Sequence, residues 1–134
     1  MKKFFFQLSK YSHYHLVDPI APGDTREDIL VDFLNEVVDE IIPHFEKREW
    51  GGLSITNVFY EDDLVFIYSD LDSDDTSDPF VLTHDNLITL MQQWYRLRVK
   101  GVMYITIVEN NGYYCLKDSH TPPVEMIEHR RNNL

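Results

Sequence analysis

The sequence predicts an α+β fold, in which an antiparallel sheet built from hairpins carries two helices packed on one face. Three observations predict it: two segments with helical apolar spacing, two hairpins with recognisable turns, and an opening run with strand alternation. The predicted order of elements is β-α-ββ-α-ββ. Hairpins pair their strands antiparallel, so the helices are expected to cover a face of the sheet rather than connect parallel strands.

Residues 3–16 form the predicted opening strand. Phe4, Phe6 and Leu8 fall on one face, and the residues between them fall on the other. The apolar run is interrupted at Gln7, which is too early for a secretory signal, so the segment is interpreted as a strand. The prolines and the glycine of residues 19–23 predict a loop after it.

The first helix is predicted to begin after a cap at Asp24 or Thr25 and to end at Pro43. Acidic residues fill one side of this segment, and apolar residues recur at helical spacing on the other. The apolar stripe consists of Ile29, Leu30, Phe33, Leu34, Val37, Val38, Ile41 and Ile42. This pattern predicts a single amphipathic helix with a buried apolar side.

The first hairpin is predicted from residues 53–60 and 64–70. Both segments are rich in β-branched and aromatic residues, and the polar turn at residues 61–63 joins them.

The second helix is predicted over Asn86–Val99, with Thr83 as its N-cap and Gly101 beyond its end. A second hairpin follows, in which Asn111-Gly112 is a strong turn signal. Residues 1–118 are therefore predicted to form one domain, and residues 119–134 a tail.

Composition favours a globular protein, because 43% of the residues are hydrophobic and 13% are aromatic. A chain of 134 residues is long enough to bury a core. Cys115 is the only cysteine, so no intramolecular disulfide can form, which suits a reducing compartment. No segment approaches the roughly 18 apolar residues of a membrane span. These observations predict a cytoplasmic location.

The chain is strongly acidic, with a formal net charge of −11. Direct nucleic-acid binding needs a basic surface, so the charge speaks against it. The part between Arg48 and Arg96 contains no lysine or arginine. It holds Glu49, Glu61, Asp62, Asp63, Asp70, Asp72, Asp74, Asp75, Asp78 and Asp85. Such a surface attracts basic proteins, although acidity that serves only solubility is the alternative.

The densest acidic segment, residues 70–78, resembles a calcium loop at first sight. Five aspartates fall within nine residues, at spacings similar to those of an EF-hand. However, Asp75 stands where that loop needs glycine, and Val81 stands where it needs glutamate. The sequence therefore predicts no metal site here.

Catalytic candidates are few. Cys115 lies within a predicted strand and is interpreted as a small buried apolar residue rather than a nucleophile. His13 and His15 share one strand face, but two ligands do not make a metal site. The sequence predicts neither an enzyme nor a cofactor.

Aromatic residues next to carboxylates point instead to protein binding. Tyr60 precedes an acidic turn and Tyr68 precedes the acidic loop. Such anchors form hot spots against basic surfaces. The alternative is that these side chains belong to the core.

The chain resembles bacterial immunity proteins, which neutralise toxins in contact-dependent and related interbacterial competition. The features that resemble this group are the compact size, the acidic span from Glu61 to Asp85, and the helix-then-hairpin texture of FVLTHDNLITLMQQWYRLRVKGVMYITIVENNGYYCL. The resemblance implies a non-catalytic inhibitor that binds its own toxin, often a nuclease. It assigns no role to any particular residue.

We therefore expect an acidic inhibitor of a basic toxin domain, with no direct contact to nucleic acid or membrane. The expected contacts are Tyr60, Glu61, Asp62, Asp63, Tyr68, Asp70, Asp72, Asp74, Asp75 and Asp78. The second choice is the acidic stripe of the first helix, which includes Asp32, Glu36 and Asp39. A cation-responsive regulatory or adaptor domain, a phage-type DNA mimic, and a small enzyme that uses the histidines or Cys115 remain as alternatives.

Overall fold

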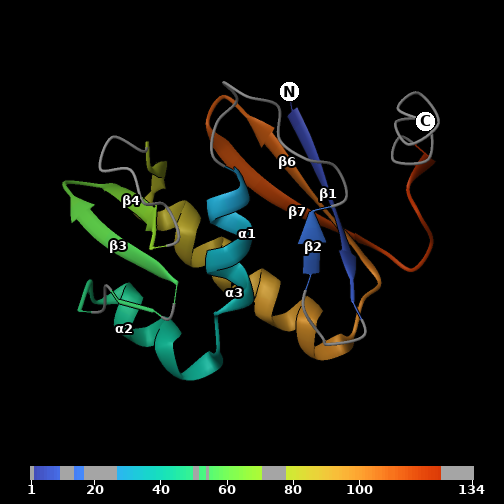
Figure 1. The fold of residues 1–134 in the computed structure, drawn as a ribbon, viewed down its shortest axis with the longest axis horizontal. Coiled ribbons are helices and arrows are strands. Elements are labelled where there is room, and N and C mark those ends of the chain that lie inside the picture. The colour runs from blue at the N-terminus through green and yellow to red at the C-terminus, as the bar shows by residue number, and fades with distance from the viewer. Residues whose placement is uncertain are drawn as a thin grey trace.

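The computed structural model describes residues 2–9, 14–16, 27–49, 52–53, 55–70 and 78–124. The predicted α+β class is confirmed (Figure 1). The elements in chain order are β1 (Lys2–Leu8), β2 (Tyr14–Leu16), α1 (Glu27–Asn35), the 3₁₀ helix η1 (Asp39–Ile41), α2 (Ile42–Glu46), β3 (Thr56–Glu61), β4 (Leu64–Ser69), β5 (Phe80–Thr83), α3 (His84–Lys100), β6 (Tyr104–Asn110) and β7 (Tyr113–Ser119).

The strands form two antiparallel sheets, where one sheet was predicted. Sheet A has the order β2-β1-β6-β7, and sheet B has the order β3-β4-β5. Each predicted hairpin is present, but the two hairpins belong to different sheets. The predicted opening strand over residues 3–16 is wrong in extent, because β1 and β2 are separate strands that pair antiparallel. Strand β1 also pairs with β6, and the short strand β5 pairs with β4. Sequence alternation did not identify β5, because its four residues lie directly between the acidic loop and a helix.

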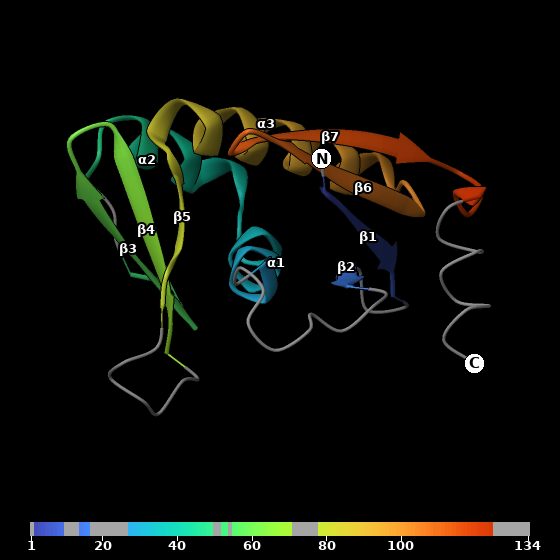
Figure 2. The same ribbon diagram turned by 90° about the horizontal axis from the view of Figure 1, so that it is seen from above.

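The helices do not cover one face of a single sheet: Figure 2 shows α1 between the two sheets and α3 running along both. Helix α1 contacts β2 of sheet A and all three strands of sheet B, and α3 contacts β7 as well as β4 and β5. Trp94 of α3 is fully buried and packs edge-on against Phe6 and Tyr14, with ring centroids 5.6 and 5.1 Å away. One apolar core therefore serves both sheets.

The first helix is shorter than predicted, because α1 ends at Asn35 and does not continue to Pro43. The Arg98 guanidinium donates to the carbonyl oxygens of Asn35 and Val37, at 3.1 and 3.0 Å. These are acceptors that a continuing helix would use for its own bonds. Pro43 lies in the first turn of α2, where its missing N–H costs nothing, so it begins a helix instead of ending one.

Helix α3 and the second hairpin follow the sequence closely. The Thr83 hydroxyl accepts a hydrogen bond from the Asn86 N–H at 3.2 Å, and Gly101 ends the helix with a φ of 69°. Asn111 and Gly112, with φ values of 53° and 83°, form the expected turn between β6 and β7. The helix begins at His84, two residues before the predicted start.

Asn86 joins α3 to the edge of sheet A. Its side-chain amide donates to the Tyr114 carbonyl and accepts from the Tyr114 N–H, both at 2.8 Å. Asn86 is buried, and it occupies the place of a neighbouring strand at this point of β7. One side chain thus supplies both hydrogen bonds that the edge lacks there.

We expect Asn86→Ala to lower the free energy of unfolding by about 3 kcal/mol, because it leaves a buried N–H and a buried carbonyl without partners. Urea unfolding followed by circular dichroism measures the change. The matched control is Gln92→Ala, which removes an exposed amide of the same helix and should change stability by less than about 0.5 kcal/mol. Equal effects of the two substitutions would contradict this role of Asn86.

Candidate functional site

The two faces of sheet B differ sharply in their surroundings. Val65 and Ile67 of β4 are fully buried, and the residues paired with them on β3 and β5 point to the same side. Phe66 lies on the opposite face, between Phe59 of β3 and Val81 of β5. We call this second face the outer face of sheet B. It consists of Asn57, Phe59, Glu61, Leu64, Phe66, Tyr68, Val81 and Thr83.

Four of the nine exposed large hydrophobic residues in the described part of the chain lie on the outer face of sheet B. Phe59 is 59% exposed, Val81 40%, Tyr68 38% and Leu64 37%. The Phe59 and Tyr68 rings meet edge to face, with centroids 5.6 Å apart. Neighbouring exposed aromatic and aliphatic side chains on one sheet face are typical of protein-binding surfaces.

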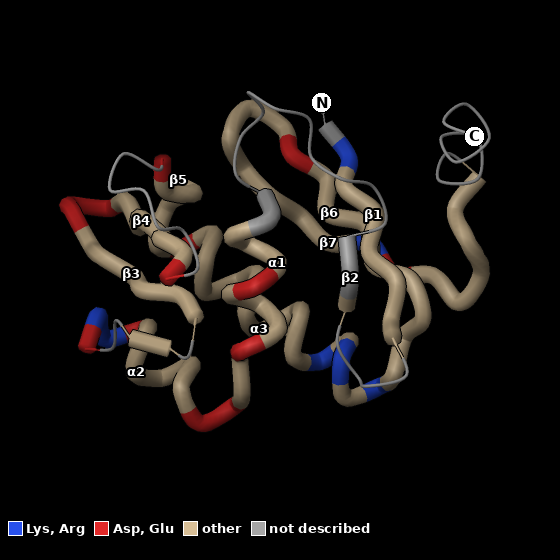
Figure 3. The backbone as a smooth tube through the Cα atoms, viewed as in Figure 1, with Lys and Arg blue, Asp and Glu red and all other residues tan. Residues whose placement is uncertain are grey.

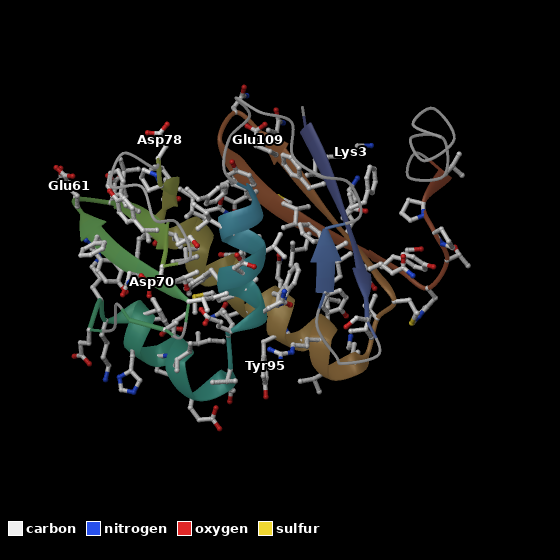
Figure 4. All side chains as sticks on the ribbon, viewed as in Figure 1. Lys3, Glu61, Asp70, Asp78, Tyr95 and Glu109 are labelled. Carbon is white, nitrogen blue, oxygen red and sulfur yellow. The ribbon has the colours of Figure 1, made fainter. Side chains whose placement is uncertain are left out.

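Carboxylates stand at both ends of this face. Glu61, Asp62 and Asp63 are exposed at the β3–β4 turn, while Asp70 and Asp78 are exposed after β4 and before β5. Figure 4 shows the side chains of Glu61 and Asp78 pointing outward from this part of the molecule. The outer face of sheet B is therefore an apolar surface with an acidic margin.

Several hydrogen bonds fix this acidic margin. The Asp63 carbonyl accepts from the His84 N–H at 2.8 Å, which ties the turn to the start of α3. The Arg48 guanidinium donates to the Asp62 carbonyl. At the other end, the Asp70 N–H donates to the Ile55 carbonyl at 2.7 Å, and the Asp70 carboxylate accepts from the Asn57 amide. Asp72, Asp74 and Asp75 lie outside the described residues.

Tyr60 was expected among the contact residues, but it lies on the inner face of sheet B. It pairs in register with buried Val65, and its ring packs edge-on against His84 at 5.9 Å. Burial raises the pKa of the Tyr60 hydroxyl to about 12, although the Arg48 guanidinium acts in the opposite direction. Tyr60 is thus partly buried against the core, and only Tyr68 of the two tyrosines lies on the outer face.

The acidic stripe expected on the first helix does not exist as one surface. Glu36 follows the end of α1, and its two carboxylate oxygens accept from the Ile55 N–H and the Thr56 hydroxyl, both at 2.7 Å. Asp39 is exposed on η1, after the helix has ended, and Asp32 is half-buried. Glu36 therefore holds β3 in place, and its carboxylate is already engaged within the fold.

The sequence did not indicate Phe59, Leu64 or Val81 as site residues. Both faces of β3 and β4 carry apolar side chains, so alternation alone does not say which face is buried. One signal was available: Asn57 and Glu61 share the parity of Phe59, whereas Val58 and Tyr60 have the opposite parity. Two polar residues on one side of a short strand mark the side that faces water.

The catalytic and metal candidates gain no support from the described residues. Among these residues no group of three or more metal-binding side chains lies together. His13 and the side chain of His15 lie outside the described part. Cys115 was expected to be buried, but it is exposed on β7, because its side chain points to the face of sheet A opposite buried Tyr114.

Comparisons with protein-family models, curated proteins and solved structures found no significant match to this chain. Within its described part, the chain has no helix that is both long and apolar enough to cross a membrane. The candidate site therefore has to be judged on its own geometry and charge.

We expect Glu36→Ala to lower the free energy of unfolding by about 2 kcal/mol, because it deprives the Ile55 N–H and the buried Thr56 hydroxyl of their acceptors. Asp39→Ala removes an exposed carboxylate nearby and should change stability by less than about 0.5 kcal/mol. Chemical denaturation of both variants measures the difference. If Glu36→Ala were as mild as Asp39→Ala, the carboxylate would not be a structural group.

The raised pKa of Tyr60 predicts that the free energy of unfolding decreases at alkaline pH. Its pKa is about 12 in the folded protein and 10.0 in an unfolded chain, so only the unfolded state ionises between these values. Stability from this group is fully present below pH 10.0 and falls as the pH rises toward about 12. Tyr60→Phe should therefore flatten the decline measured by urea unfolding at successive pH values. An unchanged decline in this variant would contradict the assignment.

Proposed function

We propose that this chain is an inhibitor of the immunity-protein type, which binds a basic protein toxin and blocks it without catalysis. The observation that supports this function best is the outer face of sheet B, where exposed apolar side chains adjoin exposed carboxylates. The proposed partner is a toxin domain with a basic surface, such as the phosphate-binding surface of a nuclease. The proposed place of action is the cytoplasm.

The apolar part of this face would supply most of the affinity. Aromatic side chains near the centre of an interface lose water fully on binding, and they carry a large share of the binding free energy. Phe59 and Tyr68 already contact each other, so little side-chain entropy remains to be lost. The strands beneath them are fixed by the core through Val58, Val65 and Ile67.

The acidic margin would raise the association rate and favour basic partners over acidic ones. Carboxylates at the edge of an interface accelerate encounter with a basic partner and disfavour acidic ones, although exposed ion pairs add little affinity. The charges of the described residues are unevenly distributed, which suits this role. Figure 3 shows acidic residues at the β3–β4 turn and near β5, whereas basic residues gather at the carboxyl end of α3.

We expect Phe59→Ala to weaken binding to the toxin domain by roughly thirtyfold, about 2 kcal/mol, through faster dissociation. Calorimetry or surface plasmon resonance with a purified basic toxin domain measures binding, and any secreted protein encoded next to this chain is the first candidate to test. Protection of growing cells by the wild-type chain, when both proteins are expressed, tests the function itself. Failure to bind or to protect would refute the proposal.

The matched control is Val99→Ala, which shortens an apolar side chain that is 68% exposed on α3, away from sheet B. It should leave the affinity unchanged. Replacing Glu61, Asp62 and Asp63 by their amides should instead slow association several-fold at low salt, with little effect at high salt. If Phe59→Ala and Val99→Ala behaved alike, the partner would not bind the outer face of sheet B.

A further inference from the structure

A groove between α3 and the edge strand β7 lies in a different part of the molecule from the outer face of sheet B. Its volume is about 240 Å³. It is lined by Gln93, Arg96, Leu97, Lys100, Leu116 and Asp118. In contrast to the acidic margin of sheet B, two of its three charged side chains are basic.

The main chain of β7 presents to this groove hydrogen-bonding groups that no described residue uses. Tyr114 directs its N–H and its carbonyl away from β6, since both bind the Asn86 side chain. Groups two and four residues further along an antiparallel strand point the same way, so Leu116 and Asp118 direct theirs to this edge. No described residue binds these groups of Leu116 and Asp118 there.

The side of α3 that faces β7 carries polar residues at intervals of two helical turns. Asn86, Gln93 and Lys100 are seven residues apart and share one side of the helix. Asn86 closes the strand edge at Tyr114, whereas Gln93 leaves its Oε1 atom buried and without a partner. A sheltered acceptor without a partner is costly, and an N–H donor placed in the groove would satisfy it.

Charge indicates what kind of segment the groove receives. Arg96 and Lys100 line it on the α3 side, and Figure 3 shows a group of basic residues at the carboxyl end of α3. Asp118 lines the groove on the β7 side, and its negative charge partly offsets the positive charges of Arg96 and Lys100. Arg98 donates to the carbonyls of Asn35 and Val37. Arg96 and Lys100 are therefore the cations that a ligand in the groove would meet.

We propose that this groove binds a short extended acidic segment of a second protein, which adds as a strand to the edge of β7. An added strand would use the Leu116 and Asp118 main chain, and its own N–H would reach Gln93 Oε1. A free anion would use only the two cations. A helix bonds its main-chain groups internally, so it could not pair with the main chain of Leu116 and Asp118. This site is separate from the outer face of sheet B and does not depend on the function proposed for it.

The test uses the full chain and a fluorescent octapeptide of alternating glutamate and valine. We expect binding at micromolar to millimolar concentration, measured by anisotropy, together with slower amide hydrogen exchange at Leu116 and Asp118. A peptide of the same length and charge, in which proline replaces two central valines, cannot donate main-chain hydrogen bonds there and should bind at least about tenfold more weakly. Equal binding of the two peptides would mean adventitious polyanion binding only and would overturn the proposal.

Paired charge reversals locate the binding. Arg96→Glu with Lys100→Glu should weaken the alternating peptide at least about tenfold. The control, Lys47→Glu with Lys117→Glu, changes net charge equally but alters the C-cap of α2 and the other face of β7. Apart from the uniform effect of net charge, it should lower peptide affinity less than about twofold. Circular dichroism confirms that both double variants fold. Equal losses in the two, or no binding by the wild-type chain at millimolar peptide, would overturn the proposal.

Gln93→Met provides an independent readout, because it removes the acceptor while keeping the shape of the side chain. Urea unfolding should show equal or higher stability, since an unsatisfied buried atom is lost. Peptide affinity should nevertheless fall several-fold. A variant that kept its full affinity would show that the segment does not reach Gln93, and the proposed geometry would be wrong.

Discussion

The packing of α3 against both sheets is the constraint on which the rest of the structure depends. One side of this helix buries Leu87, Leu90, Met91 and Trp94, and Trp94 contacts the aromatic rings of sheet A. Its amino-terminal end reaches sheet B, where the His84 ring binds the Phe45 carbonyl at 2.7 Å and packs against Tyr60. Because α3 and α1 cover the inner face of sheet B, the opposite face of that sheet remains open to solvent.

This arrangement explains which parts of the fold could be predicted from the sequence. Helix α3 has a complete set of local signals, from the Thr83 cap to Gly101, and both hairpins have turns that need little tertiary support. The end of α1 has no such signal. It depends on Arg98, which lies more than 60 residues further along the chain and binds the Asn35 and Val37 carbonyls. Local periodicity cannot report an interaction of that range.

Long-range packing also limits what the sequence could predict about the candidate site. Net charge and its distribution along the chain predicted an acidic surface, and Glu61, Asp62, Asp63, Asp70 and Asp78 are exposed. Their apolar neighbours could not be identified in the same way, because the buried face of sheet B is chosen by what packs against it. Glu36 was misinterpreted for the same reason, since its partners, Ile55 and Thr56, come from a strand about 20 residues away.

Carboxylates in this chain therefore divide by what they bind, and sequence position does not separate the two kinds. Both carboxylate oxygens of Glu36 accept hydrogen bonds from Ile55 and Thr56. A partner could bind this carboxylate only by breaking those bonds, and the free energy lost would weaken binding. Glu61 has no comparable role, because it extends from the end of a hairpin into solvent. A net charge of −11 consequently overstates the charge available to a partner. What a basic partner meets is the exposed set around sheet B, and the apolar side chains between those carboxylates distinguish a binding surface from acidity that only keeps a protein in solution.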